Sequence, residues 1–224
     1  MKKIDFLLKG ARKLKLTEGD QLFYFTLLRF AVLCLLASAM FPSLSQAQAP
    51  DGVPVFKITQ EDSSVKFFVK ASVALEGVFQ KWDATVTFTS SDISTGVLNI
   101  KIQAESVNTG SGMKDGKLKS KDFFDVKDDP IISFVSKKFV QTGPDTVEVQ
   151  GDFTIRGVSK PETLTFTATG AGTGAGDVKG TMAFDRKEFG MNSGIPFIKI
   201  ADRVEVTVDL KWKRVSGPPL DLKK

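Results

Sequence analysis

The sequence has 224 residues, with 31 Lys and Arg against 26 Asp and Glu, a length that suits one domain and a removable leader. Seven of the basic and three of the acidic residues lie in the first 29, so the rest carries 24 against 23, a net charge near +1. This balance gives no argument for a nucleic-acid partner, and we expect none. Histidine is absent and the single Cys, Cys34, lies in the leader, which excludes an imidazole base, a thiol nucleophile and zinc or haem sites built on these residues.

Residues 1–47 have the pattern of a secretory signal peptide. A basic region ends at Arg29, an apolar run follows over 30–41, and small residues precede a cleavage site that we expect after Ala47. The alternative is a membrane anchor, but this run is shorter than the ~20 residues of a spanning helix. We therefore expect a periplasmic or secreted protein with no membrane span after cleavage, in which 48–54 is a linker.

Beyond residue 55, apolar and polar residues alternate with a period of two, which is typical of strands with one buried face. The alternation predicts eight strands, at 65–70, 79–88, 98–104, 131–139, 147–156, 163–168, 178–184 and 204–212. Turn-like links rich in Gly, Pro, Asp and Ser join them, so we expect antiparallel neighbours. The Gly-rich link at 170–176 is expected to be an exposed hairpin tip.

The segment 114–130 breaks this alternation. It is densely charged, continues with the pair Phe123 and Phe124, and ends at Pro130, after which a strand pattern resumes. We expect a short helix and a loop that lie across one end of the β structure as a lid or plug. Its aspartates lack the spacing of a calcium loop and are mixed with lysines, so we expect a solvated charged surface and no metal.

Two of the expected strands, 79–88 and 147–156, are long, and long amphipathic strands need their edges covered. A closed barrel covers every edge. We therefore expect an all-β, antiparallel, eight-stranded, lipocalin-like barrel over 55–214 with the helix and loop as an insertion, followed by a disordered tail at 215–224. Eight strands leave an interior that holds one small ligand. The alternative is a sandwich, whose apolar positions would form a core without a cavity.

The chain has 19 Phe, whereas its one Tyr lies in the leader. Such an interior has few hydroxyl groups to satisfy, which suits an apolar guest as well as a packed core. The positions that we assign to binding an apolar chain are Phe67, Val69, Trp82, Val86, Phe88, Ile100, Phe123, Phe124, Phe134, Phe153, Phe166, Met182, Phe184 and Phe189. We assign Arg186 or Lys187 to a polar headgroup at the barrel mouth. The alternative for these two is a charged strand end that binds nothing.

Four collinear stretches of the sequence resemble the YceI-like proteins, which are secreted or periplasmic lipocalin-like barrels that bind polyisoprenoids. The stretches are 62–69, 118–125 with 130–134, 151–160, and 184–191 with 202–206. The resemblance covers roughly 55–214 and implies the barrel fold and a lipid-binding class. Family members often carry histidines near the opening strand and before the Phe pair, where this chain has Ser63, Ala71 and Lys117.

The sequence therefore predicts a non-enzymatic protein that sequesters or carries a long apolar lipid, either a polyisoprenoid or an isoprenoid quinone, inside the barrel. We assign no catalytic residue and no cofactor. The alternative is a structural or stress-response barrel whose interior is filled with side chains. An enzyme would have only Asp, Glu, Lys, Arg or Ser as reactive groups. A homodimer is allowed, and the sequence leaves the oligomeric state, the headgroup and the ligand length open.

Overall fold

The computed structural model describes residues 52–72, 75–170, 174–194 and 199–223. The chain divides into two units, Met1–Ala47 and Gln48–Lys224, and every described residue belongs to the second. The expected signal peptide and the first part of the expected linker lie outside the described residues.

Within the described residues, ten strands form one sheet in which all paired neighbours are antiparallel. The strands are β1 (Val55–Ala71), β2 (Leu75–Phe79), β3 (Trp82–Thr87), β4 (Val97–Gln103), β5 (Val107–Asn108), β6 (Ile131–Gln141), β7 (Thr146–Ile155), β8 (Val158–Ala168), β9 (Ala175–Asp185) and β10 (Ile200–Ser216). The helix α2 spans Gly112–Lys119, and three 3-10 turns span Ile93–Thr95 (η1), Ala104–Ser106 (η2) and Arg186–Phe189 (η3).

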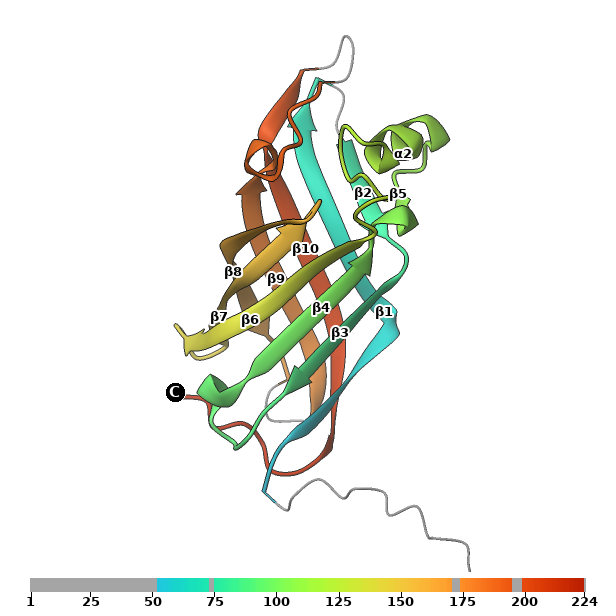
Figure 1. Ribbon diagram of the computed structural model, residues 1–224. Helices are drawn as coiled ribbons and strands as arrows, with labels where there is room; N and C mark the ends of the chain where they lie inside the picture. Colours follow the sequence, from blue (N-terminus) through green and yellow to red (C-terminus); the bar gives the residue numbers. More distant parts are fainter. Residues whose placement is uncertain (1–51, 73–74, 171–173, 195–198, 224) are drawn as a thin grey trace, which may run out of the picture. The chain divides into compact units, whose positions relative to one another are not determined.

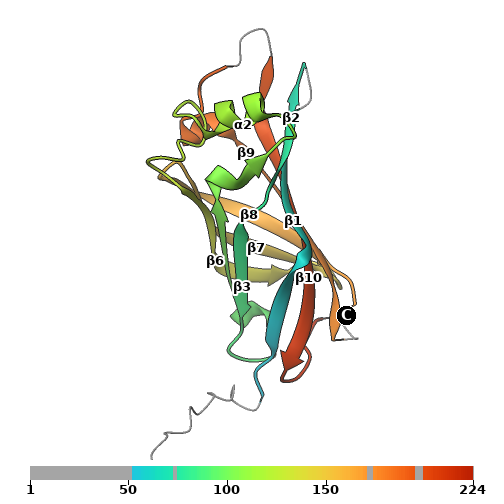
Figure 2. The same ribbon diagram turned by 90° about the vertical axis from the view of Figure 1, so that its right-hand side faces the viewer.

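The sheet order is β3-β4-β6-β7-β8-β9-β10-β1-β2-β5, and the sheet curls into a partly closed barrel (Figures 1 and 2). One continuous curled sheet excludes the sandwich. The strands β2 and β3 follow each other directly, and the chain bends at Gln80 and Lys81 so that β2 pairs with β1 and β3 with β4. With these two counted as one strand and the two-residue β5 set aside, the number is the predicted eight.

The expected full closure of the barrel is incomplete, because the described backbone ladders end at β3 on one side and at β5 on the other. A side chain links β1 to β3 instead: Gln60 Nε2 donates to the carbonyl oxygen of Trp82 at 2.8 Å. The bend at Gln80 is the physical reason for the incomplete closure, since it directs β2 and β3 to different partner strands. The structure is therefore a curled barrel with a seam between β1 and β3.

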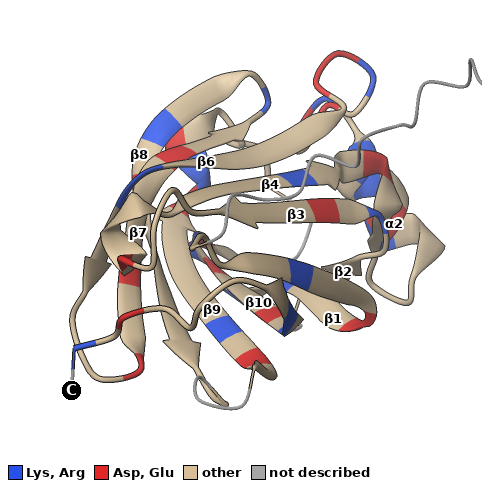
Figure 3. Cartoon of the chain, turned by 90° about the horizontal axis from the view of Figure 1, so that it is seen from below, with Lys and Arg blue, Asp and Glu red and all other residues tan. Residues whose placement is uncertain are grey.

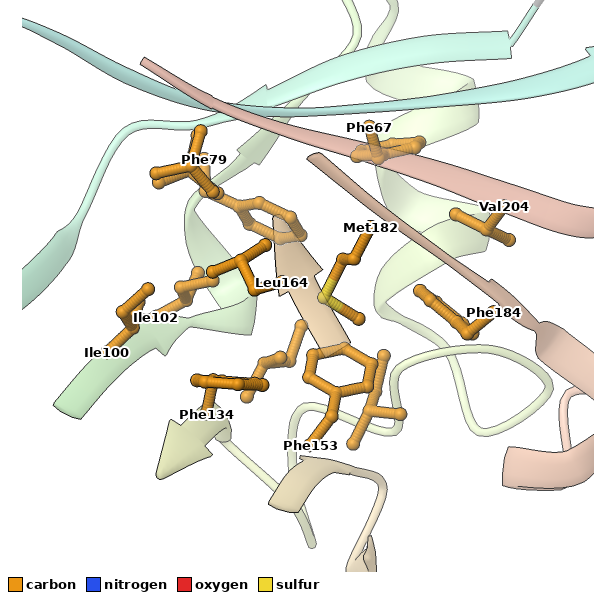
Figure 4. Packing of buried hydrophobic residues seen from close by; sticks show 14 of the residues in the cluster. Phe67, Phe79, Ile100, Ile102, Phe134, Phe153, Leu164, Met182, Phe184 and Val204 are labelled. Carbon is orange, nitrogen blue, oxygen red and sulfur yellow. The ribbon is translucent and has the colours of Figure 1, made fainter. Parts of the chain in front are cut away.

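The period-two alternation decides which side chains lie inside. In β4, Leu98, Ile100 and Ile102 are buried while the residues between them are exposed or half-buried. Inward glycines make room for phenylalanine rings, because a Cβ at Gly180 would lie 2.5 Å from the ring of Phe166. The inward faces of the strands thus build a single cluster of buried hydrophobic residues, part of which is shown in Figure 4.

The helix α2 and the loop after it lie across one end of the sheet, as the sequence predicted (Figure 1). Leu118 of the helix and Phe123 and Phe124 of the loop are buried, whereas the rest of the helix is half-buried or exposed. We call this end of the barrel the helix end. Its apolar contacts come from three side chains, which explains why the helix has no continuous apolar face.

The C-terminal tail has a defined course over 217–223, whereas the sequence predicted disorder from 215 onward. Gly217 turns the chain in a left-handed conformation (φ +80°), and Asp221 N then donates to the carbonyl oxygen of Ser91 at 2.9 Å. Lys223 exchanges two hydrogen bonds of 2.8 Å with the side chain of Gln141. These contacts hold the tail against the end of the barrel opposite the helix, which we call the tail end.

Seen from the tail end, Lys and Arg are interspersed with Asp and Glu along the strands (Figure 3). No stripe of one sign forms in this view. The mixed pattern agrees with the balanced charge of the chain beyond residue 29.

Candidate functional site

Two apolar cavities lie inside the described part of the barrel, one at each end. The tail-end cavity has a volume of about 160 Å³ and the helix-end cavity about 60 Å³. The tail-end cavity is lined by side chains of every strand except β2 and β5, and Pro219, Leu220 and Leu222 of the tail complete its wall. The tail therefore forms part of the tail-end cavity.

The helix-end cavity lies beneath the loop that follows α2. Phe124 of this loop packs edge-on against Phe67 of β1, with a centroid distance of 6.3 Å, and contacts Phe79 of β2 at 5.8 Å. A second group of rings, Phe153 and Phe184, packs with a centroid distance of 5.0 Å. Aromatic packing of this kind fills most of the helix end and explains why its cavity is the smaller.

A layer of buried side chains, the septum, separates the two cavities. It consists of Ile100, Phe134, Leu164 and Met182, each at most 8% exposed. The position of the septum follows from the order of residues along the strands. On β4, Ile100 lies between a residue that lines the tail-end cavity and one that lines the helix-end cavity. On β9, Met182 likewise lies between a residue of each cavity. Figure 4 shows Phe134, Leu164 and Met182 directed into one packed region.

The septum sets the size of guest that the closed barrel accepts. A cavity of about 150 Å³ in a protein core holds one benzene molecule. The tail-end cavity, at about 160 Å³, therefore accepts only a short segment of an apolar chain while the septum is in place. A longer chain needs the septum or the tail to move.

The predicted apolar positions divide between these three regions. The tail-end cavity contains Val86, Phe88 and Phe166, the helix-end cavity contains Phe67, Val69, Phe123, Phe124, Phe153 and Phe184, and the septum contains Ile100, Phe134 and Met182. Phe189 is fully buried against Phe153 and Phe184. Trp82 is half-buried on β3 and lines neither cavity.

The two residues assigned to a headgroup have protein partners in the structure. Arg186 is 6% exposed. Its guanidinium donates to three backbone carbonyl oxygens, those of Met191, Ser193 (3.0 Å) and Ala201 (3.2 Å), and to the carboxylate of Asp202 (3.1 Å). These bonds tie η3 to β10. The headgroup role of Arg186 stays a prediction, and it would require Arg186 to exchange some of these bonds.

Asp202 also pairs with Lys187, whose Nζ lies 2.8 Å from its second carboxylate oxygen. The hydrogen bond from Lys187, with the nearby charge of Arg186, holds the pKa of Asp202 below its ordinary value. Lys187 remains half exposed at the helix end. Its headgroup role stays a prediction.

Sequence reasoning missed part of the tail-end lining. Trp212 and Arg214 of β10 both line this cavity, and they share the inward alternation of Val208 and Leu210. That alternation was the available signal. The charge of Arg214 led away from a lining role, because a charged residue near a strand end is usually expected to be exposed.

The sequence matches the model of the YceI-like domain over residues 56–212. The chain belongs to the YceI-like family. It is 30% identical over 133 residues to a UPF0312 protein of Pseudomonas savastanoi pv. phaseolicola, a match that covers 57% of this chain and 69% of that protein. The resemblance stated from the four sequence stretches is confirmed.

Solved structures of two other proteins superpose on this one. BcnA of Burkholderia cenocepacia has a TM-score of 0.63 and 26% identity, and the match covers 69% of this chain and 99% of BcnA. A polyisoprenoid binding domain from Saccharophagus degradans has a TM-score of 0.52 and 13% identity, and the match covers 72% of this chain and 99% of that domain. At this identity the second likeness shows the shared fold.

Two further observations concern the described residues alone. They contain no helix of the length and apolar character that crossing a membrane requires. In the same part of the chain, no three acidic, His or Cys side chains come close enough together to hold a metal ion.

Proposed function

We propose that this YceI-like barrel binds one apolar lipid chain, a polyisoprenoid or an isoprenoid quinone, and carries or sequesters it without chemical change. The observation that supports this most is the tail-end cavity, whose wall consists almost entirely of aromatic and aliphatic side chains. Burial of apolar surface contributes ~25 cal/mol per Å². A prenyl chain therefore binds such a wall with few polar contacts. The fold shared with a polyisoprenoid binding domain supports the same ligand class.

A long lipid chain enters by displacing those parts of the barrel whose movement requires little free energy. Met182 of the septum is unbranched and has three rotatable side-chain bonds, so it adapts its shape more readily than its neighbours. The tail is the second such part, since polar contacts to Ser91 and Gln141 and half-buried apolar side chains hold it. Rotation of Met182 joins the two cavities into one channel, and release of the tail opens that channel.

The second candidate function is a structural or stress-response barrel without a ligand. The septum favours it, because it fills the middle of the interior with well-packed side chains. The two functions differ in one observable. A carrier retains lipid through purification, whereas a filled barrel retains none.

The test is lipid extraction and mass spectrometry of protein purified from its own host without detergent. We expect one prenyl lipid per chain, and uptake of geranylgeraniol by protein that has been stripped of lipid. Protein that is empty as purified and takes up no added prenyl lipid would refute the carrier role.

We also propose that the leader is removed after Ala47 and that the protein acts in the periplasm or outside the cell. The intact mass of protein purified from the host tests this proposal. We expect a chain that begins at Gln48, and a full-length chain recovered from the cytoplasm would contradict the proposal.

A further inference from the structure

Trp212 carries a hydrogen-bond donor without an acceptor. Its indole Nε1 is buried and has no hydrogen-bond partner among the described residues. The side chain lines the tail-end cavity, and its ring packs edge-on against Phe56 with a centroid distance of 5.4 Å. Buried donors in folded proteins nearly always have a partner. Neighbouring protein atoms cover this N–H in the closed barrel, so a bound molecule that supplies an oxygen to it must first shift those neighbours.

Arg214 lies two residues further along the same face of β10 and lines the same cavity. Its backbone N–H donates to the carbonyl oxygen of Gly174 at 2.7 Å. Its guanidinium forms no ion pair with any described carboxylate. Arg186 at the helix end is the opposite case, because carbonyl and carboxylate oxygens already occupy its donors.

The two donors line a cavity whose other lining residues are apolar except for Asp145. Phe88, Phe166 and Leu210 form part of its wall, and Leu220 and Leu222 of the tail complete it near the mouth. This arrangement suits an amphipathic guest, since ligand sites combine an apolar wall with a few placed polar groups that fix orientation. The apolar chain then points toward the septum and the polar end toward Trp212 and Arg214.

We propose that Trp212 and Arg214 bind the oxygen-bearing end of the lipid at the tail end of the barrel, beneath the C-terminal tail. The inference rests on the proposed lipid-binding function and specifies its headgroup site and the direction of insertion. The chemical class is a prenyl chain that ends in an oxygen acceptor, and an anionic carboxylate or phosphate is preferred over a neutral hydroxyl. Trp212 donates one hydrogen bond to the end group, and Arg214 supplies a charge-assisted hydrogen bond to an anionic one.

Three molecules with the same geranyl skeleton separate the polar end from the chain: geranic acid, geraniol and the hydrocarbon ocimene. Their affinities are measured by calorimetry on protein stripped of lipid. Trp212→Phe keeps an aromatic ring and removes the N–H, and Arg214→Gln removes the charge. The matched controls are Trp82→Phe, at a tryptophan that lines neither cavity, and Arg203→Gln, at an exposed arginine of β10 that pairs with Glu205.

We expect Trp212→Phe to weaken geranic acid and geraniol about tenfold and to leave ocimene within about twofold. Arg214→Gln should weaken geranic acid about tenfold, with the two uncharged ligands within about twofold. Both controls should match the wild type for all three ligands. A uniform loss across the three ligands would mean that Trp212 only packs against the chain, and it would overturn the headgroup site. If none of the three binds the wild type, the lipid-binding function itself fails, and the headgroup site fails with it.

Discussion

The substitution Met182→Ala tests whether the septum limits the length of the bound chain. Met182 is 8% exposed and lies in the septum on β9. Truncation of a buried Met to Ala costs 2–5 kcal/mol of folding free energy. Because the new space adjoins existing cavities and cannot collapse fully, we expect about 3 kcal/mol for the empty protein. Urea unfolding of lipid-free protein measures this loss.

The same substitution should favour long ligands. With the thioether arm removed, the two cavities join, and a chain that extends past the septum gains burial in the helix end. We expect the affinity for geranylgeraniol to rise about tenfold relative to that for geraniol, which corresponds to ~1.4 kcal/mol. Geranylgeraniol at about a hundredfold excess over its Kd adds about 2.7 kcal/mol of stability. The loaded variant should therefore recover most of its loss.

Met191→Ala is the matched control. Met191 is 3% exposed and lines the helix-end cavity, but it does not lie between the two cavities. We expect a similar destabilisation and no change in the preference between the two ligands. Equal preference changes in both variants, or no change in either, would show that the septum is not the barrier to a long chain.

Three further predictions follow from the same contacts. Truncation after Ser216 removes the half-buried side chains of the tail. We therefore expect the free energy of unfolding in urea to fall by about 1–2 kcal/mol and lipid release to become faster in stopped-flow exchange. An unchanged release rate would contradict the tail's part in closing the cavity. Gly180→Ala forces the Phe166 ring to move, since the new Cβ would lie 2.5 Å from it. Overpacking of this kind costs about 1–3 kcal/mol of folding free energy, and geraniol binding should weaken in calorimetry. Unchanged affinity and stability would show that the ring relocates freely. Lys117 and Lys187 hold the pKa values of Asp122 and Asp202, respectively, below their ordinary range. The stabilisation of the fold by these two ionised carboxylates is therefore present above the unfolded-state pKa of about 4, and it is lost as the pH falls through the lower folded-state values. Denaturation across acid pH checks this, and the pH dependence should flatten in Asp202→Asn.

The strands and the family could be predicted from the sequence because both depend on local pattern. The alternation in β4 and β10 assigns inward and outward residues without knowledge of the partner strands. The Phe123–Phe124 pair identified the loop that covers the helix end. The YceI-like resemblance then implied the barrel fold that these strands form.

The rest of the site depends on contacts between residues far apart in the chain. The division of the interior by the septum follows from the positions of side chains on four strands, and no single stretch of sequence records it. Arg186 looked available for a ligand because its acceptors are mostly backbone carbonyl oxygens, which every sequence contains. The tail was expected to be disordered from its Gly-Pro-Pro start, although the spacing of Leu220 and Leu222 was a signal for one apolar face.

The most direct measurement is a crystal structure of the protein loaded with geranylgeraniol. We predict one chain inside the barrel, with its oxygen within hydrogen-bond distance of Trp212 Nε1 and its hydrocarbon end beyond a rotated Met182. A lipid bound on the outer surface, with the septum unchanged and the tail-end cavity empty, would contradict the proposed function.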